Sequence, residues 1–176
     1  MIYLGADHRG FELKEKIKQW LLDWGYKYED MGALEYNPKD DYVDFVSKVA
    51  EKVSDDPVNN KGIVLGRAGQ GEAIVANKFK GVRAVVFYGP SNRYWIWSFL
   101  FGFWVTLLAF LIYRDNFKKV VKLSREDNDA NVLSLGAGFL HERLAKYVVK
   151  NWLETNFSGE ERHIRRINKI KEIENG

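Results

Sequence analysis

Short apolar runs alternate with amphipathic stretches along most of the chain, and this alternation constrains the fold more than any other feature. Apolar runs that end in glycine occur at Ile2–Gly5, Gly62–Gly66 and Asn131–Gly136. Over Phe11–Trp24, leucine, isoleucine and tryptophan recur at helical spacing. Short apolar strands separated by helices are typical of a parallel sheet covered on both faces. The sequence therefore predicts a single α/β domain over residues 1–176.

The remaining predicted elements follow the same pattern. Further helices are expected at 43–53, 71–78, 141–154 and 159–173, and further strands at 26–31 and 82–88. Parallel sheets bind ligands outside the carboxyl ends of their strands. The loops at that edge are expected to be 5–10, 32–41, 66–71, 136–138 and the residues from 88 onward. These loops are where functional residues are expected.

Composition excludes several classes of protein. The chain has no cysteine, so it has no disulfides and no thiol nucleophile, and its three histidines lie far apart in sequence, which disfavours a zinc cluster. A net charge of +3 is too small to indicate a nucleic-acid partner. The first residues read as a strand followed by a charged helix rather than a secretory leader, so a cytoplasmic location is expected.

One segment departs from this pattern. Tyr94–Tyr113 contains 20 residues without a charge, enough for an apolar helix the length of a membrane span. Ser98, Gly102 and Thr106 recur every fourth residue and would give such a helix a face suited to close packing. The predicted helix lies in an insertion at about 90–120, after the fourth strand.

A single membrane crossing would place the strands on either side of this segment in different compartments, although they must pair in one sheet. Three alternatives remain: packing against another copy in an oligomer, contact with a membrane, detergent or hydrophobic partner, and an engineered graft. Oligomeric packing is favoured, because an exposed patch of this size is not expected on a soluble monomer.

Four motifs fall at the expected ligand-binding edge or next to a strand. They are Gly5-Ala-Asp7-His8-Arg-Gly10, Asp41-Tyr42, Gly69-Gln-Gly71 and the run 128–136. In this order they resemble the type B ribose-5-phosphate isomerase family, which includes galactose-6-phosphate isomerase subunits. The resemblance covers about 1–89 and 121–173. It implies a Rossmann-like three-layer sandwich with a mostly parallel five-stranded sheet, and a homo-oligomer whose active sites are shared between subunits.

The resemblance also implies an activity and its residues. The reaction is the aldose–ketose isomerisation of a sugar phosphate, ribose 5-phosphate to ribulose 5-phosphate, through an enediolate and without a cofactor or metal. One branch of the family uses a cysteine base at position 66 and the other a glutamate at position 72. Because position 66 is Gly66 here, Glu72 is the candidate base. The other implied site residues are Asp7 and Asp127 as catalytic groups, and His8, Tyr42, Gly69, Gly71 and Asn128 as substrate-binding groups.

The phosphate is expected to meet arginines of the final helix. Arg162 and Arg166 are four residues apart, so they share one helix face, and they match the family pattern. A solvated basic helix is the alternative interpretation of this segment. A nucleic-acid interpretation is weaker, because glutamates interrupt the basic face.

Three departures from the family pattern fall on functional positions. Asp127 stands where the family has its ring-opening histidine. Arg67-Ala68 precedes Gly69, where the family has glycine followed by serine or threonine. Gly138 stands where the family has a phosphate-binding arginine. The alternative to an isomerase is therefore a catalytically inactive or engineered scaffold whose apolar helix mediates oligomer or membrane association.

Overall fold

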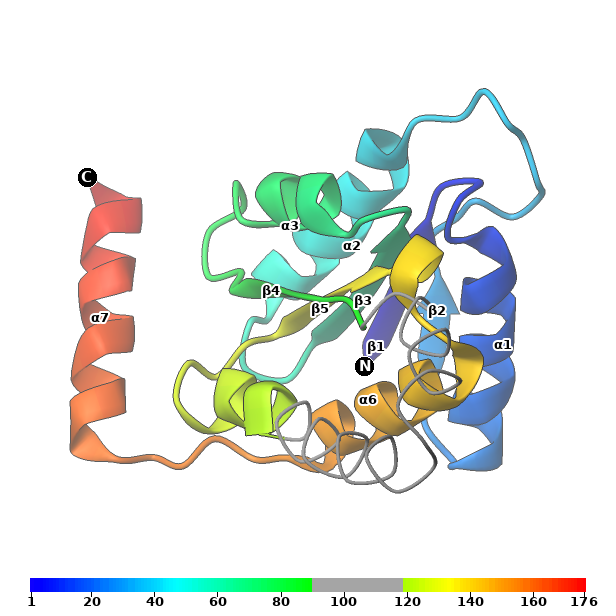
Figure 1. The fold of residues 1–176 in the computed structure, drawn as a ribbon. Coiled ribbons are helices and arrows are strands. Elements are labelled where there is room, and N and C mark those ends of the chain that lie inside the picture. Colours follow the sequence, from blue (N-terminus) through cyan, green and yellow to red (C-terminus); the bar gives the residue numbers. More distant parts are fainter. Residues whose placement is uncertain (90–118) are drawn as a thin grey trace, which may run out of the picture.

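A five-stranded sheet forms the centre of the molecule in the computed structural model, which describes residues 1–89 and 119–176 (Figure 1). The strands are β1 (Ile2–Ala6), β2 (Tyr28–Asp30), β3 (Lys61–Gly66), β4 (Ala84–Phe87) and β5 (Val132–Gly136). Their order is β2-β1-β3-β5-β4, and the pairings between neighbours are parallel. The predicted α/β class is confirmed, and the described sheet is parallel throughout rather than mostly parallel.

Helices cover both faces of this sheet. They are α1 (Phe11–Asp23), α2 (Tyr42–Asp55), α3 (Gln70–Ala76) and α6 (Glu142–Glu154); a 3₁₀ turn η1 (Ala137–Phe139) precedes α6, and a further helix, α7 (Glu161–Asn175), follows it. Residues 119–126 are also helical. The core on one face contains Ile17 of α1 and Trp152 of α6, and the core on the other contains Val46 and Val49 of α2. Burial of these apolar faces on two sides of the strands produces three layers.

Local signals place the helix ends close to the predicted positions. At the start of α2, the side chain of Asp41 accepts a hydrogen bond from the Val43 amide at 3.2 Å. This contact satisfies one of the backbone donors that a helix start leaves free. After α1, Gly25 takes a φ of +76°, a conformation that glycine adopts without steric cost.

The strand register brings the candidate loops to one edge. Gly5 of β1 pairs with Val64 of β3, and Gly66 at the end of β3 pairs with Gly136 at the end of β5. The carboxyl ends of these three strands are therefore adjacent, and the segments that follow them open on the same side. Asp7, the turn at Gly69 and the η1 turn lie at this edge.

Helix α7 lies apart from the three layers, beside the segments that precede β4 and β5 (Figure 1). Glu174 near its end accepts a hydrogen bond from the Gly81 amide at 3.0 Å. Its His163 and Ile167 are buried, whereas Ile164 and Ile170 are 43% and 44% exposed. Part of the apolar surface of α7 therefore has no cover within the described part of this chain.

The predicted apolar helix at Tyr94–Tyr113, and the contacts proposed for it, lie outside the described residues. Within 1–89 and 119–176, none of the helices combines the length and the apolar character needed to cross a membrane.

Candidate active site

The loop after β1 holds Asp7 in a fixed position. Asp7 is 7% exposed, and its Oδ1 accepts hydrogen bonds from the amides of Arg9 at 2.9 Å and Gly10 at 3.1 Å. Gly10 lies so close to Leu65 of β3 that a Cβ on it would come within 2.6 Å of the Leu65 Cβ. Glycine is therefore required here, because the loop must pack against the neighbouring strand for Asp7 to point to the sheet edge.

His8 is held by an aspartate from a distant part of the chain. Its Nδ1 lies 2.6 Å from Asp40 Oδ1, and its amide donates to the same oxygen at 3.0 Å. The two side chains are 16% and 7% exposed. An imidazole whose Nδ1 bonds to a carboxylate has a defined ring orientation and leaves Nε2 for another partner. Asp40 thus orients His8 at the edge where Asp7 lies.

Glu72 lies in the first turn of α3 and is 5% exposed. Its carboxyl group occupies the space in which a side chain on Gly66 would lie, since a Cβ built on Gly66 overlaps the Glu72 carboxyl group. The absence of a side chain at position 66 is therefore what admits this carboxyl group to the end of β3. Sequence reasoning linked these two positions only through the family's alternative bases, and the structure gives the link a steric basis.

Burial raises the pKa of the Glu72 carboxyl group above its ordinary value, and the nearby negative charge of Asp7 adds to the rise. Its own backbone amide hydrogen bond acts in the opposite direction but does not cancel the rise. A carboxylate with a raised pKa is a stronger base than an ordinary one. These are properties that suit a group that removes a proton from carbon.

The glycine-rich turn joins Glu72 to the neighbouring strand. Gly69 has a φ of +77°, and its carbonyl accepts a hydrogen bond from Ser134 Oγ of β5 at 2.6 Å. Ser134 is fully buried, so this bond ties the turn to the centre of the sheet. A Cβ on Gly71 would lie 2.9 Å from the Tyr42 hydroxyl oxygen, which places Tyr42 of α2 over the start of α3.

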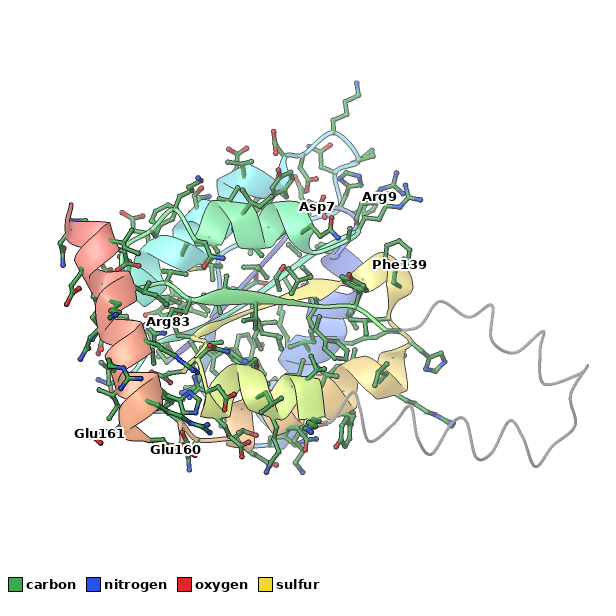
Figure 2. All side chains as sticks on the ribbon, turned by 60° about the vertical axis from the view of Figure 1, so that its left-hand side comes forward. Asp7, Arg9, Arg83, Phe139, Glu160 and Glu161 are labelled. Atoms are coloured by element: carbon green, nitrogen blue, oxygen red, sulfur yellow. The ribbon has the colours of Figure 1, made fainter. Side chains whose placement is uncertain are left out.

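Six of the predicted site residues are therefore brought to one edge: Asp7, His8, Tyr42, Gly69, Gly71 and Glu72. Figure 2 shows Asp7 and Arg9 at this end of the molecule, with Arg83 and Glu160 at the opposite end. The other four predicted residues, Asp127, Asn128, Arg162 and Arg166, are not at this edge of the same chain.

Asp127 and Asn128 precede β5, so the length of that strand separates them from Glu72, roughly 15 Å at the usual rise per residue. Asp127 Oδ1 lies 3.6 Å from His163 Nε2 of α7, and the Asn128 carbonyl accepts from Arg83 Nε at 3.1 Å. Arg162 Nε lies 2.8 Å from Glu160 Oε2. A single chain does not combine these residues with the site at Glu72.

Sequence reasoning missed Asp40 and Ser134. Asp40 directly precedes the Asp41-Tyr42 motif, so a second carboxylate next to a motif was an available signal, but its partner His8 is 32 residues away in sequence. Ser134 lies inside an apolar strand and reads as core. Only the pairing of β3 with β5 shows that its hydroxyl reaches Gly69.

Three side chains at this edge lie close enough together to be considered as metal ligands. Among the described residues, Asp7, His8 and Asp40 offer ligand atoms that all lie within 4.8 Å of one another. Hydrogen bonds already account for the arrangement, because Asp7 Oδ1 accepts two amides and Asp40 Oδ1 bonds to His8. That the reaction uses no metal stays a prediction.

Fold and site together define an α/β protein with a buried, basic carboxylate at the carboxyl edge of a parallel sheet. The sequence model of the ribose/galactose isomerases matches residues 2–92 and 115–170. The chain belongs to this family. The match leaves 93–114 uncovered, which is most of the segment predicted as an insertion.

Individual proteins support the same family. Ribose-5-phosphate isomerase B of Mycobacterium tuberculosis (strain CDC 1551 / Oshkosh) is 34% identical over 98% of this chain and 89% of its own length. The Escherichia coli (strain K12) protein of that name is 33% identical over 98% and 95%. The crystal structure of ribose-5-phosphate isomerase B from Mycoplasma genitalium with bound ribulose-5-phosphate has a TM-score of 0.80 at 30% identity. It covers 99% of this chain and 95% of that one.

Proposed function

We propose that this protein catalyses the isomerisation of ribose 5-phosphate to ribulose 5-phosphate. The observation that carries the proposal is the Glu72 carboxyl group, which is buried in the space above Gly66 and lies next to Asp7. A carboxylate with a raised pKa, surrounded by groups that can bond to sugar hydroxyls, fits proton transfer next to a carbonyl. The relatives named ribose-5-phosphate isomerase B, one of them with bound ribulose-5-phosphate, support this substrate.

The chemistry can be followed at single atoms. In the open-chain aldose, Glu72 takes the proton from C2, and the electron pair forms a C1–C2 double bond while the aldehyde oxygen gains charge. Return of the proton to C1 and transfer of the O2 proton to O1 produce the ketose, so that no proton is gained or lost overall. Asp7, His8 and Tyr42 are the side chains placed to hold the sugar hydroxyls during these steps. Exclusion of water around Glu72 strengthens each of these contacts.

The four predicted site residues at the opposite edge are proposed to act in the site of a second copy. Arg166 and Asn128 are exposed, and Arg166 forms no ion pair among residues 1–89 and 119–176. Ile164 and Ile170 leave apolar surface on α7 that a second copy would cover. A homo-oligomer with shared sites would use this surface and would supply cations for the phosphate.

The test of the activity is a turnover assay with ribose 5-phosphate, comparing the unaltered protein with Glu72→Gln. Glutamine keeps the shape but cannot accept the proton, so turnover should fall at least about a hundredfold. Absence of turnover by the unaltered protein, or equal turnover by Glu72→Gln, would refute the proposal.

Sharing of sites has its own test. Arg166→Ala and Glu72→Gln proteins should each be inactive, and subunit exchange between them should restore part of the activity, because one mixed site keeps both residues. Arg165→Ala, which removes a neighbouring charge from α7, is the matched control. No recovery after demonstrated exchange would refute shared sites and leave the activity itself untouched.

A further inference from the structure

The edge that holds Glu72 is rich in carboxylates. Asp7, Asp40 and Glu72 are all mostly buried there, with side chains of a few per cent exposure. A sugar phosphate brings further negative charge to this edge. Like charges in a partly buried site repel strongly, so binding of the sugar phosphate requires a cation near its phosphate group.

Most basic side chains near this edge are already engaged. Lys14 is fully buried and lies 2.6 Å from Asp30, and the Nδ1 of His8 is bonded to Asp40. Arg9 and Arg67, in the loops that follow β1 and β3, are exposed, and neither guanidinium has an ion-pair partner within 1–89 and 119–176. They are candidates for binding the phosphate at this edge within one chain.

Arg67 differs from Arg9 in how its side chain is placed. Arg67 directly follows Gly66, whose missing side chain leaves room for the Glu72 carboxyl group. Its carbonyl accepts a hydrogen bond from the Gly138 amide at 3.0 Å. A Cβ built on Gly138 would lie 3.1 Å from Arg67 Cγ, so the stem of Arg67 runs over the position that Gly138 leaves without a side chain.

Two glycines therefore determine where the Arg67 side chain lies. Gly66 precedes it in sequence, and Gly138 leaves the space that its stem crosses. In ribose 5-phosphate, C3, C4 and C5 separate the reacting C2 from the phosphate ester. The cation must accordingly lie about a side chain's length from the base and not in contact with it. An arginine on the residue after Gly66, with its stem on the neighbouring turn, meets this requirement.

We propose that Arg67, directly after β3, binds the phosphate group of the substrate, with its stem lying over Gly138 of the η1 turn. The inference rests on the proposed function. It also explains why a bulky cation is tolerated next to the glycine-rich turn: its stem lies over Gly138 of the neighbouring turn, where no side chain meets it.

The experiment uses the full chain and two readouts. One is kcat/KM for ribose 5-phosphate, and the other is binding of inorganic phosphate by calorimetry, which does not require turnover. Arg67→Ala should lower kcat/KM and weaken phosphate binding, each at least about tenfold, the usual effect of losing a hydrogen bond between charged groups. Arg9→Ala removes the same charge from the same edge. It should change kcat/KM and phosphate affinity by less than about threefold, because Arg9 would influence the phosphate only through a long-range charge interaction that salt screens.

A swap of position distinguishes direct contact from a structural role. Arg67→Gly combined with Gly138→Arg should recover most of the phosphate affinity that Arg67→Ala loses, since an arginine at position 138 can extend into the space that the Arg67 side chain left. Gly138→Arg alone, with Arg67 still present, should not raise phosphate affinity above that of the unaltered protein, because its Cβ meets the Arg67 stem. Thermal unfolding verifies that each variant is folded.

Unchanged phosphate binding in Arg67→Ala, or equally weakened phosphate binding in Arg9→Ala, would overturn the role of Arg67. Turnover of ribose 5-phosphate by the unaltered protein would still support the isomerase activity in either case. Absence of both turnover and phosphate binding in the unaltered protein would overturn the two proposals together.

Discussion

Replacing Gly66 with alanine should lower turnover sharply although Glu72, the proposed base, is still present. A Cβ at this position overlaps the Glu72 carboxyl group, so the carboxylate must move by roughly 1 Å or more, a misplacement that costs about a hundredfold in rate. The same overlap crowds a buried site, which should lower the free energy of unfolding by about 1–3 kcal/mol. Both effects follow from one steric conflict.

The assay is kcat for ribose 5-phosphate, with urea unfolding measured on the same samples. The controls are the same substitution in Glu72→Gln, where kcat should fall no further, and in Glu72→Ala, where the space is free and the stability cost should largely vanish. Wild-type kcat in Gly66→Ala would refute the reasoning. An equal stability loss in the Glu72→Ala background would show that the cost arises from some other contact.

Three further predictions concern buried charge. Because burial raises the pKa of Glu72, the native state keeps its proton to a higher pH than the unfolded chain does, and stability is lost as pH rises through that window. Glu72→Gln should therefore be more stable than the unaltered protein at pH 7 in urea unfolding, with a difference that shrinks towards about pH 4; a constant difference would contradict this. Lys14→Met leaves Asp30 without its closest partner and should cost about 3 kcal/mol, read from urea unfolding; an unchanged midpoint would be incompatible with a buried ion pair. Asp40→Ala frees the ring of His8 and should lower kcat/KM about tenfold; a kinetically silent Asp40→Ala would show that His8 needs no orientation.

Elements that depend on local patterns were predictable. The predicted strand at Gly62–Gly66 differs by one residue from the observed β3. Gly25 follows the end of α1 with a positive φ, at the helix end that the apolar periodicity predicted. Local apolar periodicity and a glycine at a helix end are short-range signals, so they are readable without the rest of the chain. The β4 strand was predicted too long, because Val82 and Arg83 continue the valine-rich run but lie before the paired residues.

The site depends on contacts between residues that are distant in sequence, and local sequence patterns do not predict these contacts. Glu72 and Gly66 could be linked only by the family resemblance, whereas their steric complementarity appears once β3 and α3 are placed. The bond between His8 and Asp40 joins residues 32 apart in sequence, with α1 and β2 between them. Asp127 was predicted as a site residue only from the family resemblance, and its position before β5, at the opposite edge of the same chain, appears only in the folded structure.

The most direct test of the central assignment is isomerisation in deuterated water, followed by proton NMR. If Glu72 carries the proton from C2 to C1, the unaltered protein should convert ribose 5-phosphate to ribulose 5-phosphate, with deuterium at C1 only in the fraction of turnovers in which the proton on Glu72 exchanges with solvent. Glu72→Gln should give neither conversion nor deuterium incorporation at a measurable rate. Deuterium entering the ketose as fast with Glu72→Gln as with the unaltered protein would contradict the role of Glu72, and no interconversion by the unaltered protein would contradict the isomerase assignment itself.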